Sequence, residues 1–210
     1  MDGTLVDTEP FWLEAETELM ARFNYTWRPE DQRHCLGGPL TRVGAYMAEK
    51  AGEGDSEFFV NELVSSVAEK FQTDLHFMPG AYELVEELKQ CGIPLGLVSA
   101  SPRILVDATL SRIGADVFDI SISSEDVARN KPYPDPYLRA AELIHVDIAN
   151  SLILEDSQTG ISSAQSAGAS VLAIPHIVTI APHPKTVIIN SLVGYDFAAL
   201  SQLFHDRTSA

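Results

Sequence analysis

The chain contains little cysteine, few basic residues and no long apolar run. Its two cysteines, Cys35 and Cys91, stand in unrelated contexts without Cys-x-x-Cys or Cys/His spacing, so neither a disulfide framework nor a zinc site is indicated. Lysine and arginine number 14 against 30 acidic residues, and the net charge of -16 argues against a nucleic-acid partner, because binding a polyanion depends on basic side chains. An anionic small molecule would need positive charge supplied locally at its site.

The apolar stretches exclude a membrane partner. IPLGLVSA and SLILE are far too short to span a bilayer, and the N-terminus lacks the basic start and apolar run of a signal peptide. We therefore expect a cytoplasmic protein. With 210 residues, 45% of them hydrophobic and 21% charged, the chain has the composition of a globular protein with one sizeable core, or with a core domain and a smaller insert.

Two hydrophobic patterns divide the chain. Apolar residues recur at helical spacing over 9–75, where no strand signal interrupts them. The remainder predicts alternating elements, with helices at 81–90, 102–113, 136–145, 159–167 and near 196–204, and strands at 94–99, near 119–123, 151–155 and 170–174. Because this alternation is typical of parallel βαβ units, we predict an α/β fold with a doubly wound parallel sheet.

The helical block is predicted to be an inserted domain. It begins after DGTLVD and ends at MPG, where Pro79 and Gly80 make a plausible hinge. The predicted core domain comprises residues 1–8 and 79–210, and the predicted helical domain comprises 9–78.

Polar residues follow the predicted strands, at the edge of a parallel sheet where ligands bind. The segments at these positions are Asp2-Gly3-Thr4, Ser99-Ala100-Ser101, Lys131 and Glu155-Asp156-Ser157. Adjacent carboxylates suit Mg²⁺, which also keeps waters and phosphate oxygens as ligands, while a lysine and a serine hydroxyl suit the phosphate. Glycine lets the backbone approach a ligand closely, and free N–H groups at the helix start after Ser101 could help to cradle an anion. The layout indicates phosphoryl transfer.

The same segments resemble a known family. DGTLVD, LVSAS, KPYPDPY and LILEDSQTGISSAQSAGA, in that order and spacing, are similar to the four motifs of the haloacid dehalogenase (HAD) superfamily. The insertion after the first motif resembles the helical-cap subgroup, which contains sugar-phosphate and phosphoglycolate phosphatases and β-phosphoglucomutases. The resemblance implies a HAD-like Rossmannoid core, an α-helical cap, Mg²⁺ as cofactor and a small phosphorylated metabolite as substrate. It leaves protein partners open.

The resemblance also implies catalytic and metal-binding roles. Asp2 would be the general acid/base and would lend its backbone carbonyl to the metal, which Glu155 and Asp156 would also hold. Ser99 would hydrogen-bond the transferring phosphoryl group, and Lys131 would balance charge between that group and the nucleophile.

Further contacts to the substrate are expected around these groups. Gly3 and Ala100 would join Ser99 and Lys131 in contacting phosphate. In the cap, Arg42 could meet a distal oxygen or second anion of the substrate, with a solvent-facing helix start as the alternative. We interpret Ser101 as a helix N-cap, and we expect His176 and His183, which lack metal-pair spacing, in a loop.

The first motif departs from the family's pattern. The family has Asp-x-Asp-Gly-Thr, whose first Asp is the nucleophile, whereas Met1 occupies the x position here. The covalent mechanism, in which a carboxylate attacks phosphorus and water hydrolyses the aspartyl-phosphate, would lack its nucleophile, and the sheet would lack its central strand. Three explanations stay open: a true start upstream of Met1, first residues lost from the sequence, and a truncation that leaves an inactive phosphate- or metal-binding protein.

Two enzyme functions stay open as well. The first is a Mg²⁺-dependent phosphatase that hydrolyses sugar phosphates or similar monoesters through an aspartyl-phosphate. The alternative is a β-phosphoglucomutase-like phosphotransferase, because nothing in the sequence reports the lifetime of the covalent intermediate.

Overall fold

The computed structural model describes residues 1–175 and 185–208 and divides the chain into two compact units. An α/β unit comprises Met1–Asp7 and His76–Ala210, and a helical unit comprises Thr8–Leu75. The predicted loop with His176 and His183 lies outside the described residues.

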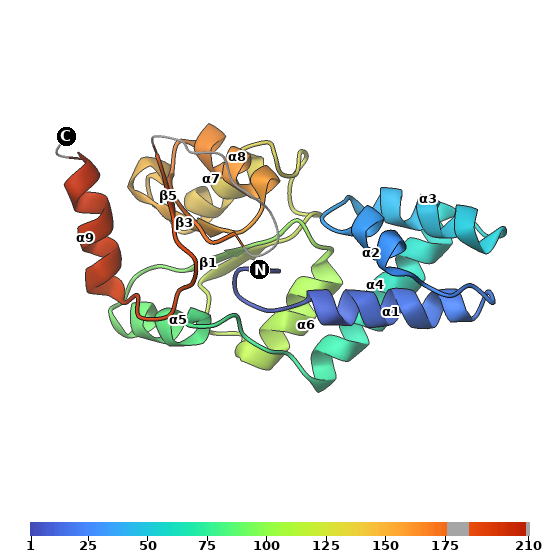
Figure 1. Ribbon diagram of the computed structural model, residues 1–210. Helices are drawn as coiled ribbons and strands as arrows, with labels where there is room; N and C mark the ends of the chain where they lie inside the picture. The colour runs from blue at the N-terminus through green and yellow to red at the C-terminus, as the bar shows by residue number, and fades with distance from the viewer. Residues whose placement is uncertain (176–184, 209–210) are drawn as a thin grey trace. The chain divides into compact units, whose positions relative to one another are not determined.

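The helical unit contains α1 (Glu9–Ala21), α2 (Pro29–Cys35), α3 (Leu40–Ala51) and α4 (Ser56–Thr73) (Figure 1). Its longest helix, α4, begins where the Asp55 side chain accepts a hydrogen bond from the Phe58 N–H at 2.8 Å. This helix contacts both α1 and α3. It buries an apolar face at helical spacing, made by Phe59, Leu63, Val67 and Phe71.

The helical unit also buries two carboxylates. Glu16 is 4% exposed and accepts a hydrogen bond from the Trp27 indole at 3.1 Å. Burial raises the pKa of Glu16 to about 7, although the bond from Trp27 acts in the opposite direction. Asp31 is held by the hydroxyls of Tyr46 at 2.6 Å and Tyr25 at 3.1 Å. Asp31 is therefore well satisfied, whereas the charged form of Glu16 is disfavoured.

The α/β unit alternates helices with short parallel strands, which confirms the predicted fold class. Its helices are α5 (Ala81–Gln90), α6 (Arg103–Ile113), α7 (Asp135–Leu143), the 3-10 turn η1 (Ile148–Asn150), α8 (Gln158–Ala167) and α9 (Phe197–Thr208). Its strands are β1 (Gly96–Val98), β2 (Ile120–Ile122), β3 (Leu152–Glu155), β4 (Ser170–Ala173) and β5 (Thr186–Ile188). The sequence pattern did not predict β5, which is only three residues long.

The described strands form two parallel sheets instead of one continuous sheet. One sheet pairs β1 with β2, placing Leu97 opposite Ser121. The other has the order β3-β4-β5 and places Ile153 opposite Val171. The first residues add only isolated bridges, Asp2 with Val6 and Val6 with Phe77. Among the described residues, therefore, no strand joins β1 to β3.

Helices cover the strands on opposite sides. Contacts join α7 to β1 and β2, and α8 to β3 and β4. In Figure 1, α7 and α8 lie on one side of the strands and α5 lies on the other. Covered in this way, β3 and β4 carry apolar residues on both faces, as predicted. The main buried cluster combines small and large side chains: Tyr137, Ile153, Ile161, Ala164, Ala167, Ala169, Val171 and Ala173.

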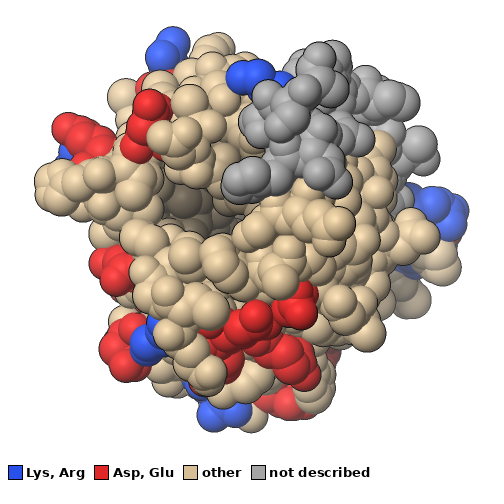
Figure 2. Space-filling view, turned by 90° about the vertical axis from the view of Figure 1, so that its left-hand side faces the viewer, with Lys and Arg blue, Asp and Glu red and all other residues tan. Residues whose placement is uncertain are grey.

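One face of the molecule carries a patch of acidic side chains (Figure 2). On the face shown in Figure 2, acidic side chains gather into a patch, while lysine and arginine side chains stand singly. This distribution agrees with the net charge of -16. None of the described helices combines the length and the apolar character that a membrane crossing requires.

Candidate active site

The N-terminal segment lies between the carboxyl ends of β1 and β3. Asp2 Oδ2 accepts hydrogen bonds from Ser99 Oγ at 3.2 Å and Ser101 Oγ at 2.9 Å, and both serines follow β1. Thr4 Oγ1 donates to Asp156 Oδ1 at 2.9 Å, directly after β3. The segment therefore links the ends of the two sheets and brings these predicted site residues together.

Gly3 permits this close approach. Its φ of +67° lies in the left-handed region, and a Cβ at this position would stand 2.3 Å from Asp156 Oδ2. The turn is closed by the Gly3 N–H, which donates to the Val6 carbonyl at 2.9 Å. Any other residue here would be strained and would displace the Asp156 carboxylate.

Lys131 and Glu155 form a buried ion pair beside this segment. Lys131 Nζ donates to Glu155 Oε1 at 2.5 Å and to the Val98 carbonyl at 3.2 Å. Their side chains are only 8% and 5% exposed. Burial alone would raise the pKa of Glu155, but the Lys131 charge and hydrogen bonds from Lys131 and Tyr137 together lower it. Glu155 is therefore held ionised.

Tyr137 is a member of this cluster to which the sequence assigned no role. Its hydroxyl donates to Glu155 Oε1, and its ring centroid lies 4.9 Å from Lys131 Nζ. Burial first, and then the charge of Glu155, raise the pKa of Tyr137 well above its usual range. Tyr137 lies within the KPYPDPY segment identified in the sequence. The neighbouring residues, however, do not indicate whether its hydroxyl donates a hydrogen bond to Glu155 or the side chain only packs in the core.

The start of α8 fixes the other oxygen of Glu155. Ser157 caps this helix by accepting a hydrogen bond from the Gly160 N–H at 3.0 Å, and its hydroxyl also lies 3.2 Å from Glu155 Oε2. A Cβ on Gly160 would stand 2.1 Å from the carboxyl carbon of Glu155. The absence of a side chain at 160 is what leaves room for this carboxylate.

We expect the substitution Gly160→Ala to destabilise the protein, although replacing a helical glycine by alanine usually stabilises by up to about 1 kcal/mol. The new Cβ would push Glu155 away from Lys131 and Tyr137, so we expect a loss of about 2 kcal/mol in the free energy of unfolding, measured with urea. The control is the same substitution in a Glu155→Ala background. A similar loss in that background would contradict the steric explanation.

The carboxylates do not form a metal cluster by their side chains alone. Among the residues whose side chains the structure describes, 1–175 and 185–203, no three His, Cys, Asp or Glu converge in a way that could hold a metal ion. Asp2 points to the serines, and both oxygens of Glu155 already accept hydrogen bonds. Asp156 differs, because burial and then the charge of Glu155 raise its pKa. A cation beside Asp156 would offset this concentration of negative charge, which fits the predicted metal position.

Ser101 does not cap α6, so its interpretation as an N-cap is wrong. The N-cap position of α6 is Pro102, with no side-chain cap, and the Ser101 hydroxyl is directed to Asp2 instead. The Arg103 N–H at the helix start is satisfied by Glu125 Oε1 at 2.9 Å, so it is not free to cradle an anion.

Ala100 and Arg42 are two further predicted phosphate contacts. Ala100 is exposed between the two serines. Arg42 belongs to the helical unit, where its guanidinium donates to the His34 carbonyl at 2.9 Å and lies against Gly38. Its role in substrate binding stays a prediction.

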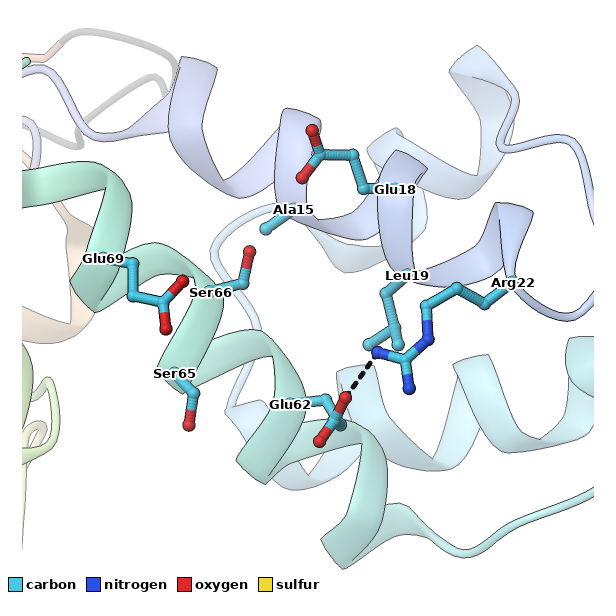
Figure 3. Close-up of a pocket in the computed structure, with 8 residues that line it drawn as sticks. All are labelled: Ala15, Glu18, Leu19, Arg22, Glu62, Ser65, Ser66 and Glu69. Atoms are coloured by element: carbon cyan, nitrogen blue, oxygen red, sulfur yellow. Dashed lines mark hydrogen bonds and ion pairs between the residues drawn. The ribbon is translucent and has the colours of Figure 1, made fainter. Parts of the chain in front are cut away.

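The helical unit contains a groove of its own, between α1 and α4, with a volume of about 360 Å³ (Figure 3). Its walls are mostly polar and are formed by Ala15, Glu18, Leu19, Arg22, Glu62, Ser65, Ser66 and Glu69. Two of its acids are paired with basic side chains, Glu62 with Arg22 at 2.5 Å and Glu18 with Lys70 at 2.9 Å. None of the residues predicted for phosphoryl transfer lines this groove.

The sequence is similar to a protein family and to individual known proteins. The family model for haloacid dehalogenase-like hydrolases matches residues 1–174. The chain is 31% identical over 188 residues to protein CbbY of Rhodobacter capsulatus, covering 83% of this chain and 82% of that protein. It is 30% identical over 179 residues to hexitol phosphatase B of Escherichia coli K12, covering 83% and 81%.

A solved structure shows the same fold. CbbY from Rhodobacter sphaeroides, in complex with phosphate, superposes with a TM-score of 0.79 at 22% identity, covering 96% of each chain. The family model spans well over half of the sequence. This chain belongs to the haloacid dehalogenase-like hydrolase family.

Proposed function

We propose that the protein is a Mg²⁺-dependent phosphatase of small phosphorylated metabolites, such as sugar phosphates. The observation that carries the proposal is the grouping of Asp2 with Ser99, of Lys131 with Glu155, and of Thr4 with Asp156, at the carboxyl ends of β1 and β3. Membership of a hydrolase family and the likeness to hexitol phosphatase B support a phosphate monoester as substrate.

The residues of the site suit the steps of phosphoryl transfer. In our proposal the Ser99 hydroxyl donates to an oxygen of the transferring group, and Lys131 offsets its charge. A carboxylate attacks phosphorus, the bond to the leaving oxygen breaks, and Asp2 protonates that oxygen. Asp2 then takes a proton from the water that hydrolyses the aspartyl-phosphate. In our proposal the attacking carboxylate is the family's first Asp, two positions before Asp2.

The proposed Mg²⁺ position is beside Asp156. Asp156 and the backbone carbonyl of Asp2 would hold the ion, with Glu155 adjacent. When bound, Mg²⁺ would neutralise part of the phosphate charge and polarise its oxygens. The raised pKa of Asp156 supports this position, because a nearby cation would favour its ionised form.

The proposed function is tested by measuring free phosphate released from hexitol and hexose monophosphates, with Mg²⁺ or with excess chelator. The assay uses the 210-residue chain and a chain extended upstream to the family's first Asp. Mg²⁺-dependent release that needs the extension supports the covalent route. Isomerised product without stoichiometric phosphate release would establish the mutase alternative, and binding of phosphate without turnover in both chains would establish a non-catalytic protein.

We expect Asp156→Asn to weaken Mg²⁺ binding at least about tenfold, because the neutral amide removes the charge that attracts the ion. Titration calorimetry with MgCl₂ measures the affinity without any substrate. The matched control is Asp116→Asn, an exposed carboxylate paired with Lys89, which should leave the affinity unchanged. Equal affinity in wild type and Asp156→Asn would place the metal elsewhere.

A further inference from the structure

We propose that Ser101 is a positioning residue for the general acid/base, and that Asp2 exchanges its proton with the substrate through Oδ1. The inference rests on the proposed phosphatase function. It specifies which oxygen of Asp2 transfers the proton and which residue holds the carboxylate in place. It follows from the unequal surroundings of the two oxygens of one carboxylate.

The Oδ2 atom of Asp2 is already occupied. It accepts from Ser99 Oγ at 3.2 Å and from Ser101 Oγ at 2.9 Å. Oδ1, in contrast, is buried and has no hydrogen-bond partner among the described residues. A buried carboxylate oxygen without a partner is unfavourable, so such an atom at a site indicates a missing ligand group. A leaving-group oxygen or the hydrolytic water would provide the missing hydrogen-bond partner of Oδ1.

The two serines are not equivalent in this arrangement. A serine hydroxyl has one proton, so Ser99 cannot donate to Asp2 while it donates to a phosphoryl oxygen. Ser101 makes the shorter contact and has no capping role in α6. Its backbone is anchored on both sides, because its N–H donates to Ser99 Oγ at 3.0 Å and its carbonyl accepts from the Ser124 N–H at 3.0 Å. Ser101 is therefore the donor that holds Asp2 while substrate is bound.

This geometry assigns each proton transfer to one atom. As the bond between phosphorus and the leaving oxygen breaks, the proton on Oδ1 passes to that oxygen. In the second half of the reaction Oδ1 takes a proton from water, whose oxygen bonds to phosphorus while the enzyme carboxylate leaves. The proton that Asp2 gives to the leaving oxygen is thus replaced by one from water, and Oδ2 stays bonded to Ser101 throughout.

The test compares two substrates that differ in their need for a general acid. An alkyl phosphate such as a hexitol phosphate has a poor leaving group, whereas p-nitrophenyl phosphate leaves as a stable anion. With Ser101→Ala we expect kcat/KM to fall about tenfold or more for the alkyl phosphate and less than about twofold for the aryl phosphate. Ser101→Thr keeps the hydroxyl and should restore the alkyl rate.

The control is Ser111→Ala, an exposed serine in α6, the helix that follows Ser101, which should change neither rate. An equal fall for both substrates in Ser101→Ala would indicate a structural role and would overturn the inference. A rise in KM with unchanged kcat would indicate a substrate contact and would overturn it as well.

A second measurement separates this inference from the proposed function. If neither the 210-residue chain nor the chain extended upstream to the family's first Asp hydrolyses either substrate, the phosphatase proposal fails, and the carboxyl ¹³C resonance of Asp2, assigned with Asp2→Asn, then decides the positioning role. We expect Ser101→Ala to shift that resonance and Ser111→Ala to leave it in place. An unshifted resonance in Ser101→Ala would overturn the inference.

Discussion

Lys131→Met is expected to lower the free energy of unfolding by about 3–5 kcal/mol, because it leaves Glu155 buried without its countercharge. The two side chains are 8% and 5% exposed, so solvent cannot replace the lost partner. Tyr137 still donates to Glu155, but a single phenol does not offset the desolvation of a carboxylate. Urea unfolding followed by circular dichroism measures the loss.

Two further variants test that explanation. Lys131→Met combined with Glu155→Gln removes the unpaired charge and should recover most of the loss. Lys89→Met breaks an ion pair with Asp116 in which the side chains are 39% and 89% exposed, and it should change the stability far less than Lys131→Met does. If the double variant is as unstable as Lys131→Met, the loss comes from packing of the lysine stem and not from the buried charge.

Glu16→Gln is expected to stabilise the helical unit at pH 8 by up to about 3 kcal/mol. The folded pKa of Glu16 is raised from 4.5 to about 7, so the folded state binds a proton more tightly than the unfolded state. The contribution of Glu16 is therefore fully present below pH 4.5 and is lost as the pH rises through about 7. Glutamine keeps an acceptor for Trp27 but has no charge to lose.

Tryptophan fluorescence is the appropriate measurement for Glu16→Gln. The chain has two tryptophans, Trp12 and Trp27, and both lie in the helical unit, so their signal reports that unit alone. The gain from Glu16→Gln should shrink as the pH is lowered from 8 to 5. Glu53→Gln, at an exposed position, is the control and should give no such trend. A gain that stays constant with pH would show that Glu16 binds the same number of protons in the folded and unfolded states, and would contradict the raised pKa.

The sequence predicts the helices and strands well where the residues that mark their ends coincide with the pattern of buried apolar residues. The bounds of α5 are the predicted 81–90, because its apolar periodicity and the Gly80 before it coincide. The strands β1, β3 and β4 were recognisable as apolar runs because helices cover them. β5 was missed, although it is no shorter than β1 and β2.

The site was predictable only as a set of segments. That polar residues gather after β1 and β3 follows from parallel topology, but which atoms meet depends on contacts between residues far apart in sequence. Ser101 before Pro102 has the sequence of an N-cap, yet it bonds to Asp2, 99 positions away. The pairing of Lys131 with Glu155 and the role of Tyr137 depend on the packing of α7 against α8, which no local pattern specifies.

The two glycines beside the acidic pair have a consequence for sequence variation. Gly3 leaves space for Asp156, and Gly160 leaves space for Glu155, so in each pair the length of one side chain limits the other. Positions 155 and 160 should therefore covary among homologous chains. A relative with alanine at 160 should carry a shorter side chain at 155, while the left-handed backbone at position 3 keeps glycine there whatever acid follows β3.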